Sequence, residues 1–98
     1  MKMVFIAYNV GIHEEVMEAL RALGLTSYTR WNEVTGSGRT AGPHLGNDVW
    51  PALNSAIVVA TDDDRARALL DAVRGLKSAL GRLGIKAYAW TVEETDQA

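Results

Sequence analysis

Two short stretches of the chain are apolar on both of their alternating sides. One spans residues 2–9 and the other spans residues 54–60. In the first stretch the two alternating sets are Met3, Phe5 and Ala7, and Val4, Ile6 and Tyr8. A strand with apolar residues on both sides is typically buried on both faces of its sheet. The pattern therefore predicts two central strands.

Two further segments repeat apolar residues at helical spacing. In residues 12–23 the repeating positions are Ile12, Val16, Ala19, Leu20 and Leu23, with Glu14 and Glu15 in the first turn. Gly24 follows as a C-terminal stop. In the second segment the stripe consists of Ala66, Leu69, Leu70, Val73, Leu76, Leu80 and Leu83. Both segments are predicted to be amphipathic helices.

The second helix has recognisable end signals. The run Thr61–Asp64 precedes it, and we expect Thr61 to cap the helix with Asp64 as its reciprocal partner. The helix is expected to end near Gly81 or Gly84. Gly75 inside it costs about 1 kcal/mol relative to alanine, which does not overturn the helical prediction.

Residues 27–34 alternate more weakly and carry charges, which suits an edge strand, and residues 85–92 predict a final strand. Residues 93–98 form an acidic tail that we expect to fray. The order is βαββαβ over a single domain, residues 1–98. This order predicts an α+β ferredoxin-like sandwich: an antiparallel four-stranded sheet with strands 1 and 3 central and two helices on one face.

The second face of this sheet needs a cover. Two helices cover one face only, yet the first, third and fourth strands carry apolar residues on both sides, including Tyr88, Trp90 and Val92 in the last strand. Leaving that face in water would forfeit several kcal/mol at about 25 cal/mol per Å². We therefore predict a homo-oligomer that packs through the uncovered faces.

Composition narrows the classes of function. The 98 residues are 48% hydrophobic, carry a net charge of −2 and include no cysteine, so disulfides and thiolate chemistry are excluded. The charge argues against nucleic-acid binding. No apolar stretch reaches the ~20 residues of a membrane span, and no signal-peptide pattern is present, so a cytoplasmic location without membrane insertion is expected.

The connection over residues 35–53 is the candidate functional region. Both prolines and four of the nine glycines of the chain fall within it. A hairpin needs only about 2 to 5 connecting residues, and a longer irregular segment in a small domain is usually functional or disordered.

The start of this loop has the composition of an anion-binding turn. Flanking glycines in Gly36-Ser37-Gly38-Arg39 let backbone N–H groups converge on an anion, and Arg39 adds a forked cationic donor. We assign the effector site to Gly36, Ser37, Gly38, Arg39, Gly42 and His44. The alternative is a flexible β-ribbon whose glycines serve only its turns.

Other chemistries have weaker support. His13 and His44 could bind zinc or copper with Asp48, Glu14 or Glu15, but their spacing carries no metal-ligand signature, and no metal residues are assigned. Trp31, Trp50 and Trp90 suit packing as well as ligand stacking. The serines lack a nucleophile context, and no acid–base pair stands out, so we predict a non-enzymatic protein.

The segment from Thr29 to Arg39, followed by Gly42, resembles the end of strand 2 and the start of the T-loop in PII signal-transduction proteins. That family carries a Glu-Val-x-Gly-x-Gly-Arg-x-x-Gly run, matched in order by Glu33, Val34, Gly36, Gly38, Arg39 and Gly42. Gly24-Leu25-Thr26 and the βαββαβ order also have counterparts there. The resemblance implies a homotrimer with inward-facing sheets and intersubunit clefts that bind an adenine nucleotide, with Gly36, Gly38 and Arg39 near its phosphates.

The chain departs from the nitrogen-regulatory members of the family in several places. Leu80–Lys86 lacks most of their phosphate clamp, and Thr91–Glu94 replaces an arginine pair with carboxylates. The loop has no tyrosine for nucleotidylation, and Thr40 stands where those proteins have the glutamine linked to 2-oxoglutarate. The chain is therefore more similar to shortened, divergent PII-like proteins, some of which resemble regulators of membrane transporters.

The sequence leads to one hypothesis with two alternatives. The hypothesis is a PII-like trimer that binds ATP, ADP, AMP or cyclic AMP and acts through its loop on a partner protein such as a membrane transporter. One alternative is a CutA-like metal-tolerance trimer that uses His44. The other is a small enzyme of the related ferredoxin-like type.

Overall fold

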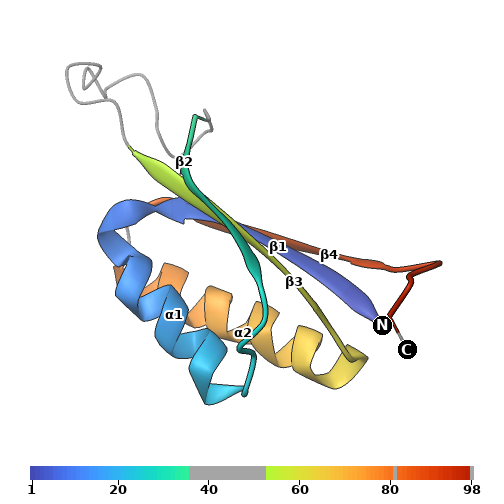
Figure 1. The fold of residues 1–98 in the computed structure, drawn as a ribbon. Helices are drawn as coiled ribbons and strands as arrows, with labels where there is room; N and C mark the ends of the chain where they lie inside the picture. The colour runs from blue at the N-terminus through green and yellow to red at the C-terminus, as the bar shows by residue number, and fades with distance from the viewer. Residues whose placement is uncertain (36–52, 81, 98) are drawn as a thin grey trace.

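The computed structural model describes residues 1–35, 53–80 and 82–97. These residues form β1 (Lys2–Asn9), a 3-10 turn η1 (Val10–Ile12), α1 (His13–Ala22), β2 (Thr29–Val34), β3 (Asn54–Thr61), α2 (Asp63–Leu80) and β4 (Ile85–Thr91). The strands make one sheet in the order β2-β3-β1-β4, and all their pairings are antiparallel. Both helices lie on the same side of the sheet (Figure 1). The predicted α+β ferredoxin-like architecture, with strands 1 and 3 central, is confirmed.

The core fills the space between the helices and one face of the sheet. The sheet contributes alternate residues of β1 and β3, and the helices contribute their apolar stripes. Its buried members include Val4, Ile6, Tyr8, Ile12, Val16, Leu20, Ile57, Val59, Leu69 and Val73. Alternation along the strands puts the remaining apolar residues on the other face.

That second face is apolar and has no cover within the described chain. Phe5 of β1 lies between Val58 of β3 and Tyr88 of β4, and Met3 pairs with Trp90. The exposed fractions of Tyr88 and Trp90 are 57% and 49%. We call this surface the open face; its members are Met3, Phe5, Ala7, Trp31, Ala56, Val58, Ala60, Tyr88 and Trp90.

The helix α1 ends just before Gly24, the glycine that was predicted to stop it. Gly24 has φ 71°, a left-handed conformation that favours glycine. Its N–H bonds the carbonyl of Arg21 at 2.9 Å, and the N–H of Leu25 bonds the carbonyl of Leu20 at 2.9 Å. These two bonds form a Schellman motif that satisfies the last carbonyl groups of the helix.

The predicted cap of α2 was wrong by one residue. Thr61 is the last residue of β3, where it pairs with Lys2. The cap is Asp62, whose Oδ1 accepts a hydrogen bond from the N–H of Arg65 at 2.8 Å. No hydrogen bond joins Asp64 to Thr61 among the described residues. The helix then runs unbroken through Gly75 to Leu80.

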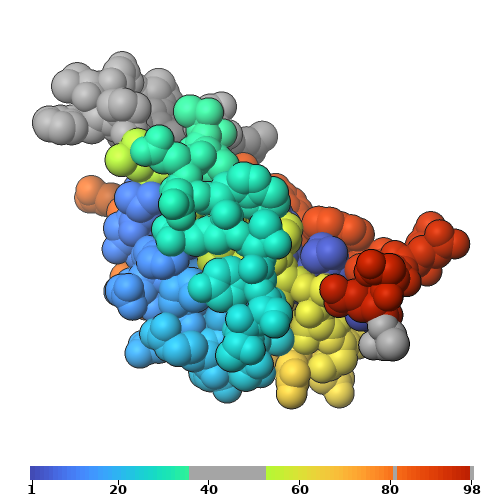
Figure 2. Space-filling model, in the orientation of Figure 1, coloured from blue at the N-terminus to red at the C-terminus, as the bar shows by residue number. Residues whose placement is uncertain are grey.

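The remaining boundaries shift slightly. The first helix begins at His13, after the turn η1, and β2 begins at Thr29 rather than at Ser27. The last strand ends at Thr91, and the N–H of Val92 then bonds the carbonyl of Met1 at 3.1 Å. Figures 1 and 2 show the segment after β4 projecting from the sheet and then turning back toward the N-terminus. In the described part of the chain, no helix is both long and apolar enough for a membrane crossing.

Candidate functional site

A cleft opens at one end of the sheet, between the start of β2 and the start of α2. It is lined by the linker Gly24–Ser27, by the end of β3 at Ala60–Asp62, and by Met1 and Arg65. Its volume is about 400 Å³. Small-molecule sites commonly have volumes of about 300 to 1,000 Å³, so the cleft has the size of a nucleoside site.

The linker forms one wall of the cleft because α1 stops at Gly24, before β2 begins. The backbone N–H groups of Thr26 and Ser27 make no hydrogen bond with other described residues. Both side chains carry hydroxyl groups and are exposed. The wall therefore offers donors and acceptors in a setting that is partly polar and partly apolar, which suits a base edge or a ribose.

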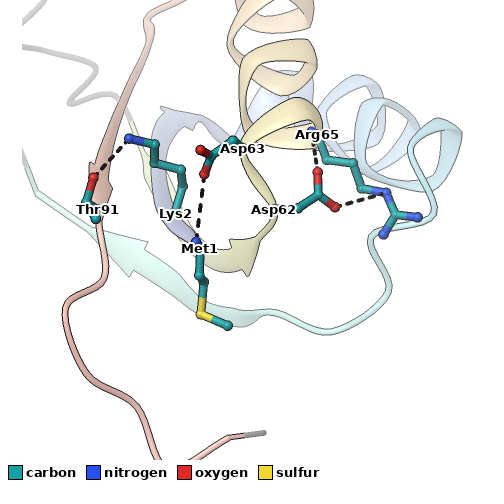
Figure 3. A network of polar contacts seen from close by, with 6 residues as sticks. All are labelled: Met1, Lys2, Asp62, Asp63, Arg65 and Thr91. Atoms are coloured by element: carbon teal, nitrogen blue, oxygen red, sulfur yellow. Dashed lines mark hydrogen bonds and ion pairs between the residues drawn. The ribbon is translucent and has the colours of Figure 1, made fainter.

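Charged groups of both signs surround the other wall (Figure 3). The amino group of Met1 lies 3.7 Å from Oδ1 of Asp63, and Nε of Arg65 lies 3.7 Å from Oδ2 of Asp62. Nearby, Nζ of Lys2 donates to Oγ1 of Thr91 at 2.9 Å. Exposed pairs of this kind contribute at most about 1 kcal/mol each, so their partners are free to exchange for a ligand.

The residues assigned from the sequence to the effector site lie outside the described residues. They are Gly36, Ser37, Gly38, Arg39, Gly42 and His44. The structure does fix where their loop begins and ends. Val34 pairs with Asn54, and the carbonyl of Leu53 accepts from the N–H of Val10 at 2.9 Å. Both ends of the loop therefore leave the sheet together.

The cleft and the loop 35–53 lie at opposite ends of β2. The cleft includes the linker just before Thr29, and the loop follows Val34. A strand rises about 3.3 Å per residue, so the two ends of this six-residue strand are roughly 17 Å apart.

His13, one of the two histidines considered as a metal ligand, makes a different contact. Its Nδ1 lies 2.7 Å from the hydroxyl group of Tyr8, and the two rings stack with centroids 5.8 Å apart. Burial, followed by the positive charge of Arg30, lowers the pKa of His13. Among the described residues no group of three or more metal-ligating side chains comes together.

Sequence reasoning missed the cleft and the contact between Tyr8 and His13. The cleft draws on residues from Met1, the α1–β2 linker and the β3–α2 junction, which are far apart along the chain. The only local signal for the cleft was Gly24-Leu25-Thr26, which marks the helix stop and the first residue of the polar wall.

No protein-family model matches the chain, and no curated protein matches it in sequence. Solved structures do match its fold. A PII-like signalling protein from Thermus thermophilus aligns with a TM-score of 0.65 and 19% identity, over 91% of this chain and 83% of its own.

The structure of CPII from Thiomonas intermedia K12 bound to ADP, AMP and acetate aligns with a TM-score of 0.68 and 16% identity, over 95% of this chain and 88% of its own. The same protein bound to ADP and bicarbonate gives a TM-score of 0.66 and 19% identity over the same shares. These alignments cover nearly the whole domain of this chain, well beyond the loop motif that first suggested the likeness. The chain therefore has the fold of the PII-like signalling proteins.

Proposed function

We propose that the chain is a PII-like regulator that assembles as a homotrimer and binds an adenine nucleotide between its subunits. The observation that carries the proposal is a structural alignment: 95% of the chain aligns with a protein that was solved in complex with ADP and AMP. The cleft beside Gly24–Ser27 supplies a wall of suitable size and polarity. The proposed regulator is not an enzyme.

The open face supports the oligomer. Trp31, Tyr88 and Trp90 each expose 47% or more of their surface on the side of the sheet away from the helices. Aromatic residues bury large areas at interfaces, and exposed apolar patches of this kind commonly mark contact surfaces. Packing the open faces of three copies against one another would remove these side chains from water.

The separation of cleft and loop supports a shared site. Within one chain the cleft and the start of the loop lie at opposite ends of β2, which are roughly 17 Å apart by the rise of a strand. We propose that the cleft of one copy holds the base and ribose and that Gly36, Gly38 and Arg39 of a neighbouring copy hold the phosphates. The rest of the loop 35–53 would then contact a regulated partner protein, such as a membrane transporter.

Isothermal titration with ADP, AMP, ATP and cyclic AMP tests this function, with copper and zinc in parallel for the metal alternative. Replacing Arg39 with alanine is expected to weaken nucleotide binding by about 1.5 to 3 kcal/mol, the contribution of a charged hydrogen bond. Arg67→Ala, which removes an exposed charge from α2, is the matched control. Absence of binding by any phosphorylated ligand at millimolar concentration would refute the proposal.

A further inference from the structure

We propose that Arg65 is the residue by which the cleft distinguishes a nucleotide from a nucleoside. Its guanidinium group binds the phosphate attached to the ribose, while the buried hydroxyl group of Thr61 contacts the nucleoside itself. The inference rests on the proposed nucleotide function and adds to it a specificity that comes from α2 and β3. It needs no residue of the loop 35–53.

The backbone of Arg65 is fixed at the cleft, and its guanidinium group has unused donors. The N–H of Arg65 donates to Oδ1 of Asp62 at 2.8 Å, which caps α2. Its Nε lies 3.7 Å from Oδ2 of the same carboxylate, beyond hydrogen-bonding distance. Within residues 1–35, 53–80 and 82–97, no hydrogen bond uses this guanidinium group. All five of its N–H donors can therefore serve a ligand.

Arg65 and Thr61 lie at different depths of the cleft. Both residues line it. The side chain of Arg65 is 53% exposed, whereas Thr61 is 8% exposed. In Figure 3 the side chain of Arg65 extends from the start of α2 toward the linker that follows α1. A ligand that fills the cleft therefore meets Thr61 at its inner end and Arg65 at its outer end.

The hydroxyl group of Thr61 indicates that the inner end receives a polar ligand. Thr61 ends β3, and strand alternation places it with Ile57 and Val59 on the helix side of the sheet. The hydroxyl group makes no hydrogen bond with the part of the chain that the structure describes. A buried hydroxyl group without a partner costs free energy, and a base or a ribose in the cleft supplies that partner.

The charges around Arg65 assign it to one particular phosphate. Among the residues that line the cleft, Arg65 has the only lysine or arginine side chain. One guanidinium fork matches one phosphate group. Further phosphates that ran along α2 would be repelled by the carboxylates of Asp62, Asp63 and Asp64. The nucleoside fills the cleft, so the phosphate at its outer end is the one attached to the ribose.

NMR titrations of the full chain with adenosine, AMP and ADP test the proposal. The wild type is expected to bind AMP and ADP at least about tenfold more tightly than adenosine. Arg65→Gln should weaken the binding of AMP and ADP about tenfold or more and leave the binding of adenosine unchanged. An equal loss for adenosine would overturn the proposal, because Arg65 would then contact the nucleoside or shape the cleft.

Two further variants separate the contacts. Thr61→Val keeps the size of the side chain without its hydroxyl group, and it should weaken all three ligands by the same factor. Arg67→Gln removes an exposed charge two residues further along α2 and should bind all three ligands like the wild type. Unchanged binding in Thr61→Val, or equal weakening in Arg67→Gln and Arg65→Gln, would count against the proposal.

The titrations also separate this inference from the proposed function. If the wild type binds AMP and ADP and Arg65→Gln binds them equally well, the nucleotide function stands and the role assigned to Arg65 is wrong. If the wild type binds none of the three ligands, the nucleotide function and the role of Arg65 are both wrong.

Discussion

The hydroxyl group of Ser55 donates a hydrogen bond to the backbone carbonyl of Asn32 across 2.7 Å. This contact lies where the pairing of β2 with β3 shifts register, between Trp31 and Val34. A register shift leaves backbone groups outside the regular ladder, and the buried hydroxyl satisfies one of them. Ser55 therefore stabilises the part of β2 from which the long loop departs.

Replacing Ser55 with alanine should lower the free energy of unfolding by about 0.5 to 1.5 kcal/mol, because the part-buried hydrogen bond to the carbonyl of Asn32 is lost. Urea unfolding measures the change. Ser78→Ala on the exposed side of α2 is the control and should have little effect. A Ser55→Ala protein as stable as the wild type would show that water satisfies the carbonyl equally well.

His13 should make stability depend on pH. Burial, followed by Arg30, holds its folded-state pKa below the ordinary value of 6.5. The unfolded chain therefore takes up the proton first, and the stabilising contribution of neutral His13 is present above pH 6.5 and lost as the pH falls through the folded-state pKa.

Urea unfolding of wild type and His13→Gln between about pH 5 and pH 8 tests this dependence. The wild type should lose more stability than the variant on the acid side, and carboxylates common to both proteins cancel in the comparison. Parallel curves for the two proteins would contradict a lowered pKa.

The cap of α2 can be tested by paired substitutions. Asp62→Ala should lower the free energy of unfolding by about 0.5 to 2 kcal/mol, since the N–H of Arg65 loses its acceptor. Asp64→Ala removes the same charge from the first turn without removing that hydrogen bond. Thermal unfolding should therefore separate the two variants, and equal losses would show that charge near the helix dipole accounts for the whole effect.

Two glycines should respond to alanine in opposite directions. Gly24→Ala forces a side chain into φ 71° and should destabilise the protein by about 1 kcal/mol or more. Gly75→Ala lies inside α2, where an added Cβ meets nothing within 4 Å. It should stabilise by about 0.5 to 1 kcal/mol. Denaturant midpoints measure both changes, and a destabilised Gly75→Ala protein would mean that this side of α2 is packed against something.

A charge placed on the open face should disrupt assembly. Trp90→Glu places a carboxylate where the trimer would bury it, and burying an unpaired charge is strongly unfavourable. The variant should sediment as a smaller species than the wild type. Leu83→Glu, at an exposed apolar position away from the open face, is the control and should assemble normally. Loss of assembly in both variants would point to a general effect of added charge.

The sequence was enough to predict the fold because the relevant signals are local. Residues 2–9 are apolar on both sides, and this pattern marked β1 as a central strand. The need for a cover on the second face followed from the apolar residues of the first, third and fourth strands and from the presence of only two helices in the predicted order. The prediction for the cap of α2 failed because Thr61 and Asp62 are both good capping residues. The choice between them depends on where β3 ends, and that is set by the pairing of Thr61 with Lys2.

The candidate site depends on contacts that no local pattern contains. The cleft joins Gly24–Ser27, Thr61 and Arg65, which come from a linker, a strand and a helix. The fold brings these residues together, although each one alone reads as an ordinary residue of its segment. The loop motif from Gly36 to Gly42 was readable from the sequence, and its role stays a prediction.

Sedimentation equilibrium of the purified chain at micromolar concentration tests the central claim most directly. The claim is that the open face is covered by further copies, which creates the shared nucleotide site. The account predicts a species of about three times the 10.6 kDa mass of one chain. A stable 10.6 kDa monomer would contradict it, because the cleft and the loop of neighbouring copies would then have no means of meeting.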